Sequence, residues 1–418
     1  MTDPDVYITK VKIHNVRHLK DIDIPLSDTG RKHLIFTGIN GSGKTSVLEA
    51  IKEYLGNADN TDNTVSLVSY IADNYYFGSK DFLQDEKLQK EIRKRKEIFA
   101  FIDNITKKTG VELFFNHDYL SYSVSFAIGK CIAAFFKTKR GEGFLQPKGA
   151  NKLDFKKQYD FSDKAGYEFT QHIFNLQVDR LFAEKDNDIK TVNEINNWFI
   201  MFEQSLKKIF EDNDIKLEFD RKNYDHYIIK KGRERFTFNQ LSDGYLAIFD
   251  IVLELIMRME PHRTNLYDIQ GIVLIDEIET HLHVSLQKGI LPFLTSFFPR
   301  IQFIVTTHSP FVLSSIENAV ICDLENNIID SDFSGYSYDG IIESYFDIDK
   351  YSQDIKDKIE RYEHLADLEM LTEEDEDKLF KLEMYLKGIP AFLAPELKLK
   401  FQQVELALLL KNIKNGKR

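Results

Sequence analysis

The sequence predicts an α/β fold in which a parallel or mixed sheet is flanked by helices. Two observations carry this prediction. Near-continuous apolar runs, separated by segments of helical spacing, occur at Leu34–Phe36, Gly271–Ile275, Phe303–Val305 and Val320–Cys322. Strands covered by helices on both faces have this composition, because neither face meets water. In addition, a glycine-rich loop follows the first run directly and leads into a segment whose apolar residues share one helical face.

The composition is that of a chain with a full hydrophobic core. It has 418 residues, of which 43% are hydrophobic, enough for two or three subdomains. A net charge of -12 argues against a protein that coats nucleic acid with its whole surface, although local basic faces could still do so. Cys131 and Cys322 lie in apolar segments, so we expect buried thiols. The polar first residues and the lack of a long apolar run lead us to expect a cytoplasmic protein.

The first elements follow from simple periodicity. Alternation at Tyr7, Thr9, Val11 and Ile13 predicts one strand, and Ile22, Ile24 and Leu26 predict a second. After the glycine-rich loop, Val47, Leu48, Ile51 and Leu55 fall on one side of a helix that we expect to end near Gly56.

Between residues 57 and 230 the pattern is more varied. A helix is predicted over roughly 84–108, with Leu88, Ile92, Phe99 and Ile102 facing inward. Strand-like runs follow at Val111–Phe115 and Ser123–Phe136, and then a polar, basic stretch at 137–157. A helix near 191–210 and strands at Lys216–Phe219, Tyr227–Lys230 and Arg235–Phe238 complete the region. No sustained heptad pattern occurs, so we expect a compact lobe and no long coiled coil.

The region beyond about residue 336 reads as charged helices. Thr372 with Asp375 has the spacing of a capping box, before a helix with Leu379, Leu382 and Leu386 on one face. A last helix is predicted over Pro395–Asn412, with a stripe of Leu399, Val404, Leu408 and Leu409. The predicted organisation is an α/β core in two parts, 1–56 and 231–335, an inserted helical-and-strand lobe at 57–230, and a helical tail at 336–418 for oligomer or partner contacts.

The glycine-rich loop carries the strongest chemical signal. Residues 38–45 read G-x-x-x-x-G-K-T, the pattern of a phosphate-binding loop. Its backbone N–H groups and the following helix N-terminus would surround a polyphosphate. The predicted nucleotide-binding residues of the loop are Gly38, Asn40, Gly41, Ser42, Gly43, Lys44, Thr45 and Ser46. Lys44 would neutralise the β- and γ-phosphates and the Thr45 hydroxyl would ligate Mg²⁺, so ATP and Mg²⁺ are the expected cofactors.

Three further segments extend this reading. Ser242 and Gly244 begin an amphipathic helix and could bind an anion, although Ser-Asp is also an ordinary N-cap. Asp276 and Glu277 end an apolar strand, where Asp276 would hold the metal and Glu277 would act as general base. His308 follows the next apolar strand and could bond the γ-phosphate and sense its loss.

The segment Glu279–His283 contains two histidines, His281 and His283. On a helix, residues two apart point in different directions, which argues against a metal site. A loop that reaches a second subunit is the better interpretation.

Taken in order, these segments resemble the ABC-type ATPase heads of the RecF/SMC/Rad50 clade. The resemblance implies a Walker A loop at 38–45, a signature at 241–245, a Walker B strand at 272–277, a D-loop at 279–283 and a switch histidine at His308. The opening hairpin is also similar, which implies that Arg17 lies near the nucleotide. Two features depart from the family: the signature reads LSDGY, and no glutamine loop can be placed, with Gln146, Gln171 and Gln177 as the candidates.

Within the clade, the sequences of the signature and Walker B segments are similar to those of stand-alone ATPases of bacterial anti-phage systems of the Septu, retron-associated and PARIS types. The resemblance implies two heads paired head to tail, with each ATP between Lys44 of one and Ser242 of the other. It further implies a nucleotide-gated sensor or scaffold for an effector encoded nearby, most often a nuclease. The alternative is a RecF-like ATPase of DNA repair and recombination.

Basic residues leave room for contact with double-stranded DNA. Arg93–Lys96 and the stretch from Lys137 to Lys157 are locally basic, and solvated surface is their simplest interpretation. The second interpretation is that these stretches line a groove for DNA in the closed dimer. The residues expected to contact DNA there are Arg93, Lys94, Lys139 and Arg140.

Overall fold

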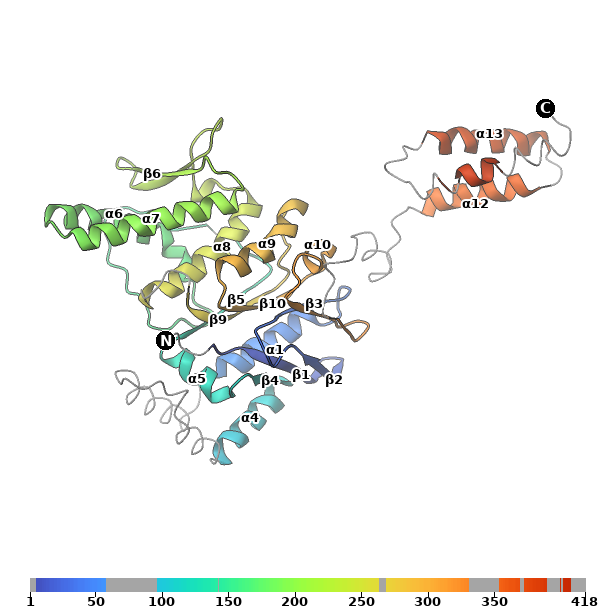
Figure 1. The fold of residues 1–418 in the computed structure, drawn as a ribbon. Helices are drawn as coiled ribbons and strands as arrows, with labels where there is room; N and C mark the ends of the chain where they lie inside the picture. Colours follow the sequence, from blue (N-terminus) through green and yellow to red (C-terminus); the bar gives the residue numbers. More distant parts are fainter. Residues whose placement is uncertain are drawn as a thin grey trace. The chain divides into compact units, whose positions relative to one another are not determined.

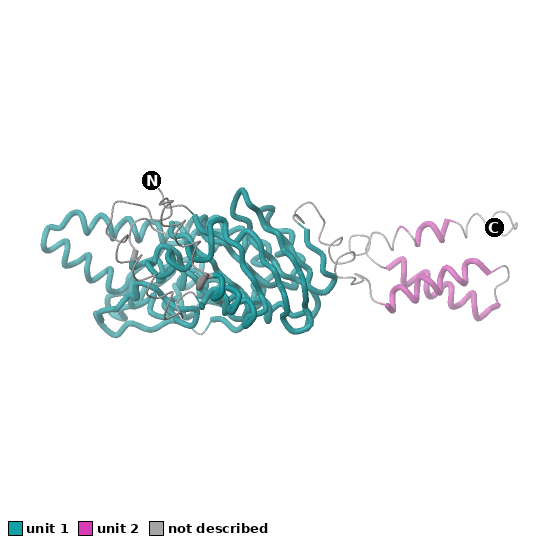
Figure 2. The backbone as a smooth tube through the Cα atoms, turned by 90° about the horizontal axis from the view of Figure 1, so that it is seen from below, with its two compact units in different colours: residues 1–338 teal, residues 339–418 magenta. Residues whose placement is uncertain are grey.

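The computed structural model describes residues 5–57, 96–141, 143–262, 268–330, 353–368, 372–388, 399 and 401–406. The chain divides into two compact units, residues 1–338 and 339–418 (Figure 2), and each is described here by itself. No helix among the described residues is long and apolar enough to cross a bilayer.

A six-stranded sheet forms the centre of the first unit (Figure 1), in the order β12-β11-β3-β10-β9-β5. The strands are β3 (His33–Thr37), β5 (Cys131–Phe136), β9 (Gln270–Ile275), β10 (Ile301–Thr306), β11 (Ala319–Asp323) and β12 (Ile328–Asp330). All neighbours run parallel except β11 and β12. The four apolar runs noted in the sequence are therefore strands of one largely parallel sheet, and the predicted α/β fold is confirmed.

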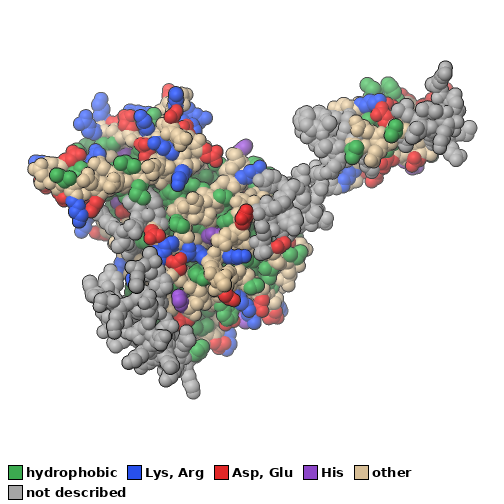
Figure 3. Space-filling view, viewed as in Figure 1, with side chains coloured by type: hydrophobic (Ala, Val, Ile, Leu, Met, Phe, Trp, Pro, Cys, Tyr) green, Lys and Arg blue, Asp and Glu red, His purple; other side chains and the backbone are tan. Residues whose placement is uncertain are grey.

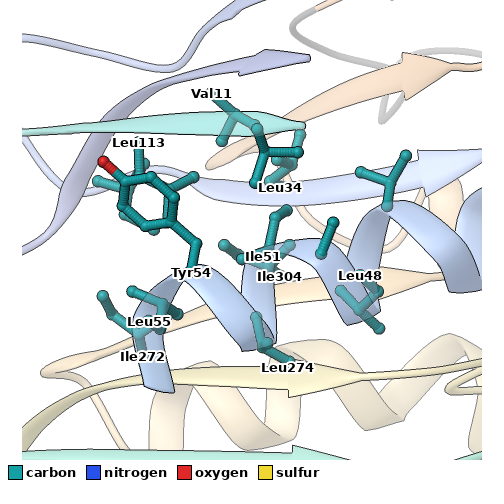
Figure 4. Packing of buried hydrophobic residues seen from close by; sticks show 14 of the residues in the cluster. Val11, Leu34, Leu48, Ile51, Tyr54, Leu55, Leu113, Ile272, Leu274 and Ile304 are labelled. Atoms are coloured by element: carbon teal, nitrogen blue, oxygen red, sulfur yellow. The ribbon is translucent and has the colours of Figure 1, made fainter. Parts of the chain in front are cut away.

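Helix α1 (Lys44–Gly56) lies between this sheet and a second, antiparallel one, β2-β1-β4. The second sheet consists of β1 (Ile8–Val16), β2 (Leu19–Pro25) and β4 (Val111–Phe115). Figure 4 shows the packing: Leu48, Ile51 and Tyr54 of α1 meet residues of both sheets. Those residues are Val11 and Leu113 on one side and Leu34, Ile272, Leu274 and Ile304 on the other. The helix that follows the glycine-rich loop is thus fixed along its length.

Helices α8 (Asp243–Met259) and α9 (Val284–Phe297) lie on the other face of the central sheet from α1 (Figure 1). Alongside them, α6 (Phe169–Lys185) and α7 (Ile189–Ile209) form a hairpin, and β6 (Lys216–Asp220), β7 (Asp225–Ile229) and β8 (Phe236–Thr237) form a small antiparallel sheet. Aromatic rings join these parts: Phe169 contacts Trp198 and Phe202, and Phe238 contacts Phe249 of α8. This aromatic core attaches the lobe to α8.

The second unit contains α12 (Gln353–Asp367), α13 (Glu373–Lys387) and a helical segment at 401–406. Its core consists of Ile359, Tyr362, Leu386 and Phe401. The predicted capping box is confirmed, since Thr372 and Asp375 exchange side-chain and backbone hydrogen bonds. Of the stripe predicted for the last helix, Val404 packs on this core and Leu399 is exposed, whereas Leu408 and Leu409 lie outside the described residues.

Several local predictions are wrong. The run from Ser123 was expected to be strand, but α5 (Tyr119–Ala127) is a helix, begun by Asp118, whose carboxylate accepts the Ser121 N–H. It is buried on all sides, so its composition resembles that of a buried strand. In α4 (Lys96–Thr109) Phe99 is 62% exposed and not inward. Leu88 and Ile92 lie outside the described residues.

The topology also differs from the predicted division of the chain. β4 and β5 both fall within 57–230, yet β4 pairs with β1 and β5 pairs with β9 of the central sheet. The helix α6, at Phe169–Lys185, was not predicted at all. Cys131 and Cys322 are buried free thiols, as expected.

Candidate nucleotide-binding site

The candidate site lies where the central parallel strands end. In the register of the sheet, Thr306 of β10 pairs with Phe36 of β3, and Val305 pairs with Ile275 of β9. The loop at 38–43, the pair Asp276–Glu277 and the segment from Thr307 therefore leave the sheet side by side. Ligands of open α/β folds bind at this carboxyl edge of the sheet.

Residues 38–43 form a loop that only glycine permits at its bends. Gly38, Gly41 and Gly43 have φ angles of 133°, 90° and 96°, values that L side chains rarely adopt. A Cβ at Gly38 would lie 2.8 Å from Ser42 Oγ, and one at Gly43 would lie 3.0 Å from Leu19 Cδ1. Helix α1 begins at Lys44, immediately after the loop. Its free N–H groups and dipole make this terminus suited to a phosphate.

Lys44 is folded back onto the loop. Its Nζ donates to the carbonyls of Gly38 and Ile39, both at 2.8 Å, and lies 3.3 Å from Ser42 Oγ. The side chain is 6% exposed, and this burial lowers its pKa, opposed by the nearby carboxylates of Glu277 and Glu279. The ammonium is thus held at the loop by weak acceptors that a phosphate oxygen could replace.

Asp276 is the centre of a cluster of threonine hydroxyls. Thr45 Oγ1 lies 3.1 and 3.0 Å from its two carboxylate oxygens, Thr306 Oγ1 donates at 2.7 Å, and Thr138 Oγ1 donates at 3.0 Å. Asp276 itself is 4% exposed. A carboxylate and a hydroxyl oxygen side by side are ligands of the kind that Mg²⁺ prefers, alongside phosphate and water. The residues present therefore fit this ion, and Thr45 and Asp276 could hold it.

Glu277 is held in an uncommon backbone conformation. Its φ angle is 45°, in the left-handed region. Its N–H donates to Thr306 Oγ1 at 2.7 Å, and its Oε2 accepts the Thr280 hydroxyl at 3.2 Å. Non-glycine residues in this region persist where surrounding contacts determine them, often at functional sites.

His308 is joined to the segment that precedes α9. Glu279 accepts the His308 N–H at 2.6 Å and the Thr307 hydroxyl at 2.7 Å. Burial, together with the Lys44 charge, lowers the pKa of His308, while Glu279, Glu277 and a bond with the Gly38 backbone oppose this change. The ring lies beside the glycine-rich loop, and the lowered pKa favours its neutral form.

The opening hairpin reaches the same region. Arg17 is exposed, with φ at 55°, in the turn between β1 and β2. The neighbouring His18 ring lies 3.6 Å from the position that a Cβ on Gly43 would occupy. The structure therefore brings the Arg17 turn beside the loop, whereas a role for Arg17 with nucleotide stays a prediction.

The signature segment lines a different hollow. Ser242 is the exposed N-cap residue of α8 and makes no side-chain cap bond. With Gly244 it borders a cavity of about 470 Å³, whose other lining includes Glu211, Tyr245, His281 and His283. His281 lies in a turn and His283 is the N-cap residue of α9, and the described residues contain no cluster of three metal-ligating side chains.

The sequence motifs missed two residues at the site, Thr138 and Arg140. Both follow β5, where no known motif was found, and Arg140 donates to the backbone carbonyls of residues 276–278. Gln146 is exposed, and Gln171 and Gln177 bond with residues of the lobe, so the glutamine loop stays unplaced. The prediction that Arg140 faces DNA is wrong, because it is 8% exposed and bonded inward; Arg93 and Lys94 lie outside the described residues.

Comparison with known proteins agrees with this geometry. Residues 152–314 match the family described as "AAA domain, putative AbiEii toxin, Type IV TA system". A retron Ec83 probable ATPase of Escherichia coli is 30% identical over 219 residues, covering 48% of this chain and 40% of the relative. The Septu protein PtuA of Bacillus mycoides (strain KBAB4) is 25% identical over 380 residues, covering 85% of this chain and 47% of the relative.

A solved structure of an SMC head bound to the C-winged helix domain of ScpA aligns over 78% of this chain and 97% of its own, at 13% identity and a TM-score of 0.39. The chain spans less than half the length of the two relatives above. The glycine-rich loop and the Asp276–Glu277 pair at the carboxyl edge of the sheet are consistent with this similarity to an AAA domain and to a probable ATPase. Over part of its length, the chain is thus similar to probable ATPases of retrons and to the Septu protein PtuA.

Proposed function

We propose that this chain binds and hydrolyses ATP and acts as a nucleotide-gated sensor or scaffold for an effector in bacterial anti-phage defence. The observation that supports it most is the contact of Thr45 with Asp276, at 3.0 Å, with Glu277 next in the chain. It joins a phosphate loop, a metal-binding carboxylate and a candidate base within one small volume.

Each site residue has a specific role in this proposal. The loop N–H groups and Lys44 bind the β- and γ-phosphates, and Thr45 and Asp276 hold Mg²⁺, which supplies charge neutralisation at the phosphates. Glu277 accepts a proton from the attacking water, and His308 bonds the γ-phosphate. Because Glu279 holds the His308 backbone, loss of that phosphate would be passed to residues 279–283.

The signature side supports a dimer in the proposal. Ser242 is exposed and borders a cavity lined by His281 and His283, with no residue of the phosphate loop in its lining. In a head-to-tail pair, this cavity would receive the γ-phosphate of ATP bound to the other copy. ATP would then favour the closed pair and hydrolysis would release it.

The effector role rests on the relatives, whose names place them in retron and Septu systems. The lobe within 57–230 and the unit at 339–418 are the candidate surfaces for an effector, which we propose to be a nuclease or toxin of the same cytoplasmic compartment. For DNA, Lys137 and Lys139 are exposed, but on the face shown in Figure 3 basic and acidic side chains are interspersed. A protein partner is therefore favoured over an extended DNA groove.

The first test measures ATP hydrolysis and complex formation together. The protein is co-purified with the product of the neighbouring gene, and the mass of the complex is read in ATP for the native chain and for Glu277→Gln. We expect Glu277→Gln to lower turnover by at least about 100-fold and to accumulate an ATP-bound closed assembly, because binding is kept and the base is lost.

Normal turnover in Glu277→Gln would exclude its role as the base. A complex whose composition does not respond to nucleotide would exclude the gated scaffold. A lone monomer–dimer equilibrium that gains affinity only for DNA would favour the RecF-like repair function instead.

A further inference from the structure

The residues Thr138–Gly141 follow the end of β5 and belong to none of the sequence motifs. In the central sheet, Phe136 of β5 pairs with Ile275 of β9. The two strands end together, so the residues after β5 lie beside Asp276 and Glu277. Arg140 is the residue of this segment that contacts their backbone.

Arg140 binds three successive carbonyl oxygens. Its Nη1 donates to Asp276 O at 3.1 Å, and its Nη2 donates to Glu277 O at 2.8 Å and to Ile278 O at 3.3 Å. The side chain is 8% exposed, and burial lowers the pKa of its guanidinium while Asp250 and Glu279 oppose the change. A planar guanidinium can span several acceptors at once, which an ammonium cannot do.

These carbonyls belong to the turn that sets the direction of the Glu277 side chain. Glu277 has its φ angle at 45°, and its N–H is already bound by Thr306 Oγ1. With Arg140 on its carbonyl, both polar groups of its backbone are held. We propose that Arg140 is a positioning residue for Glu277, which keeps the carboxylate aimed at the attacking water.

Gly141 and Phe144 contact residues in and next to the signature region. Gly141 N–H lies 3.4 Å from Asp250 Oδ2 on α8. Phe144 exchanges two hydrogen bonds with the Asn239 amide, at 2.7 and 3.0 Å, three residues before Ser242. A shift of α8 would therefore reach Arg140, and with it the Glu277 turn, through the contact of Gly141 with Asp250, which links engagement of the signature to the orientation of the base.

This inference rests on the proposed ATP hydrolysis and assigns a residue that the motifs do not include. The experiment compares Arg140→Lys and Arg140→Ala with a matched control, Arg221→Ala, an exposed arginine in the turn between β6 and β7. Steady-state hydrolysis gives kcat and KM, a fluorescent ATP analogue gives Kd, and thermal unfolding checks that each variant is folded.

We expect kcat to fall about 30-fold or more for Arg140→Ala and about 10-fold for Arg140→Lys, with KM and Kd changed by less than about twofold, because a misplaced reacting group costs rate and not affinity. Arg221→Ala should match the native chain. If Arg140→Ala does not fold, Arg140→Lys carries the test, since lysine keeps the positive charge but lacks the planar guanidinium that bonds several carbonyls at once.

A double-mutant cycle separates positioning from general damage. In the Glu277→Gln background, Arg140→Lys should change the residual rate by less than about twofold, because there is no carboxylate left to position. If Arg140→Lys lowered kcat equally in both backgrounds, or if the Arg140 variants had the native kcat, the positioning role of Arg140 would be overturned. The proposed ATP hydrolysis would not be affected by either result. Absence of hydrolysis in the native chain, or native rates in Lys44→Ala, would overturn the proposed function itself.

Discussion

The phosphate-loop side and the signature side of the first unit differ in how complete they are. On the phosphate-loop side, Asp276 is 4% exposed and accepts hydrogen bonds from three threonines of three different segments. On the signature side, Ser242 is exposed, has no side-chain cap bond and borders a cavity of about 470 Å³. The polar groups on the phosphate-loop side are therefore held in place by the chain itself, whereas the signature side has an open cavity.

The difference is informative about where regulation can act. A site whose polar groups already bond one another needs little reorganisation to bind its ligand. An exposed helix N-terminus with free N–H groups is an incomplete anion site. We therefore expect substitutions on the phosphate-loop side to abolish activity within one chain, and substitutions on the signature side to act on the pairing of chains.

The largest effect is expected from Lys44→Ala. The ammonium that now bonds Gly38 O and Ile39 O would be missing, so the phosphates would lose their main cation. Binding of a fluorescent ATP analogue and hydrolysis should both fall by more than about 100-fold. Retained affinity, measured by titration, would mean that the loop binds phosphate without its lysine and would remove the contrast between the two sides.

Ser242→Arg should leave nucleotide affinity within about twofold and lower hydrolysis by about 10-fold or more, because the added side chain fills the cavity beside His281. The informative experiment mixes it with Lys44→Ala. In a head-to-tail pair, a mixed dimer has one complete site, so an equal mixture should regain about a quarter of the native rate. No recovery on mixing would show that the signature serves its own chain and would exclude the shared site.

The smallest effect concerns His308. Because burial and the Lys44 charge lower its pKa below the ordinary value of 6.5, the ring takes up its proton at a lower pH than in the unfolded chain. Its contribution to stability is therefore complete above pH 6.5 and is lost as the pH falls toward the folded pKa. This loss should be small, because the ring is only partly buried and solvent screens its charge.

NMR titration of the His308 ring, assigned with His308→Gln, checks this expectation. The midpoint should lie below 6.5 without nucleotide and rise when ATP is bound in the Glu277→Gln background, since phosphate charge stabilises the imidazolium. A midpoint that ATP does not move would separate His308 from the γ-phosphate.

Much of the fold could be predicted because its signals are local. The run Gly271–Ile275 can only be buried, and its strand is confirmed as β9. The capping box at Thr372 is confirmed for the same reason, since four neighbouring residues determine it. The run from Ser123 failed because α5 is buried on all sides, and burial removes the periodicity that separates helix from strand.

The candidate site divides in the same way. Lys44, Thr45 and the loop glycines could be proposed from the sequence because binding a phosphate requires fixed residues at fixed spacing. Thr138 and Arg140 were missed because their role depends on the pairing of β5 with β9, which joins residues about 140 positions apart and leaves no local pattern.

The sequence by itself determined four strands of the central sheet and the glycine-rich loop, and it pointed to Asp276, Glu277 and His308 as candidates, because each depends on short-range periodicity or on a motif whose chemistry constrains neighbouring residues. Only the tertiary structure decided that Asp276 lies among three threonine hydroxyls, that Arg140 is buried against the Glu277 turn, and that Ser242 stays exposed. These facts follow from strand order and register, which long-range packing selects.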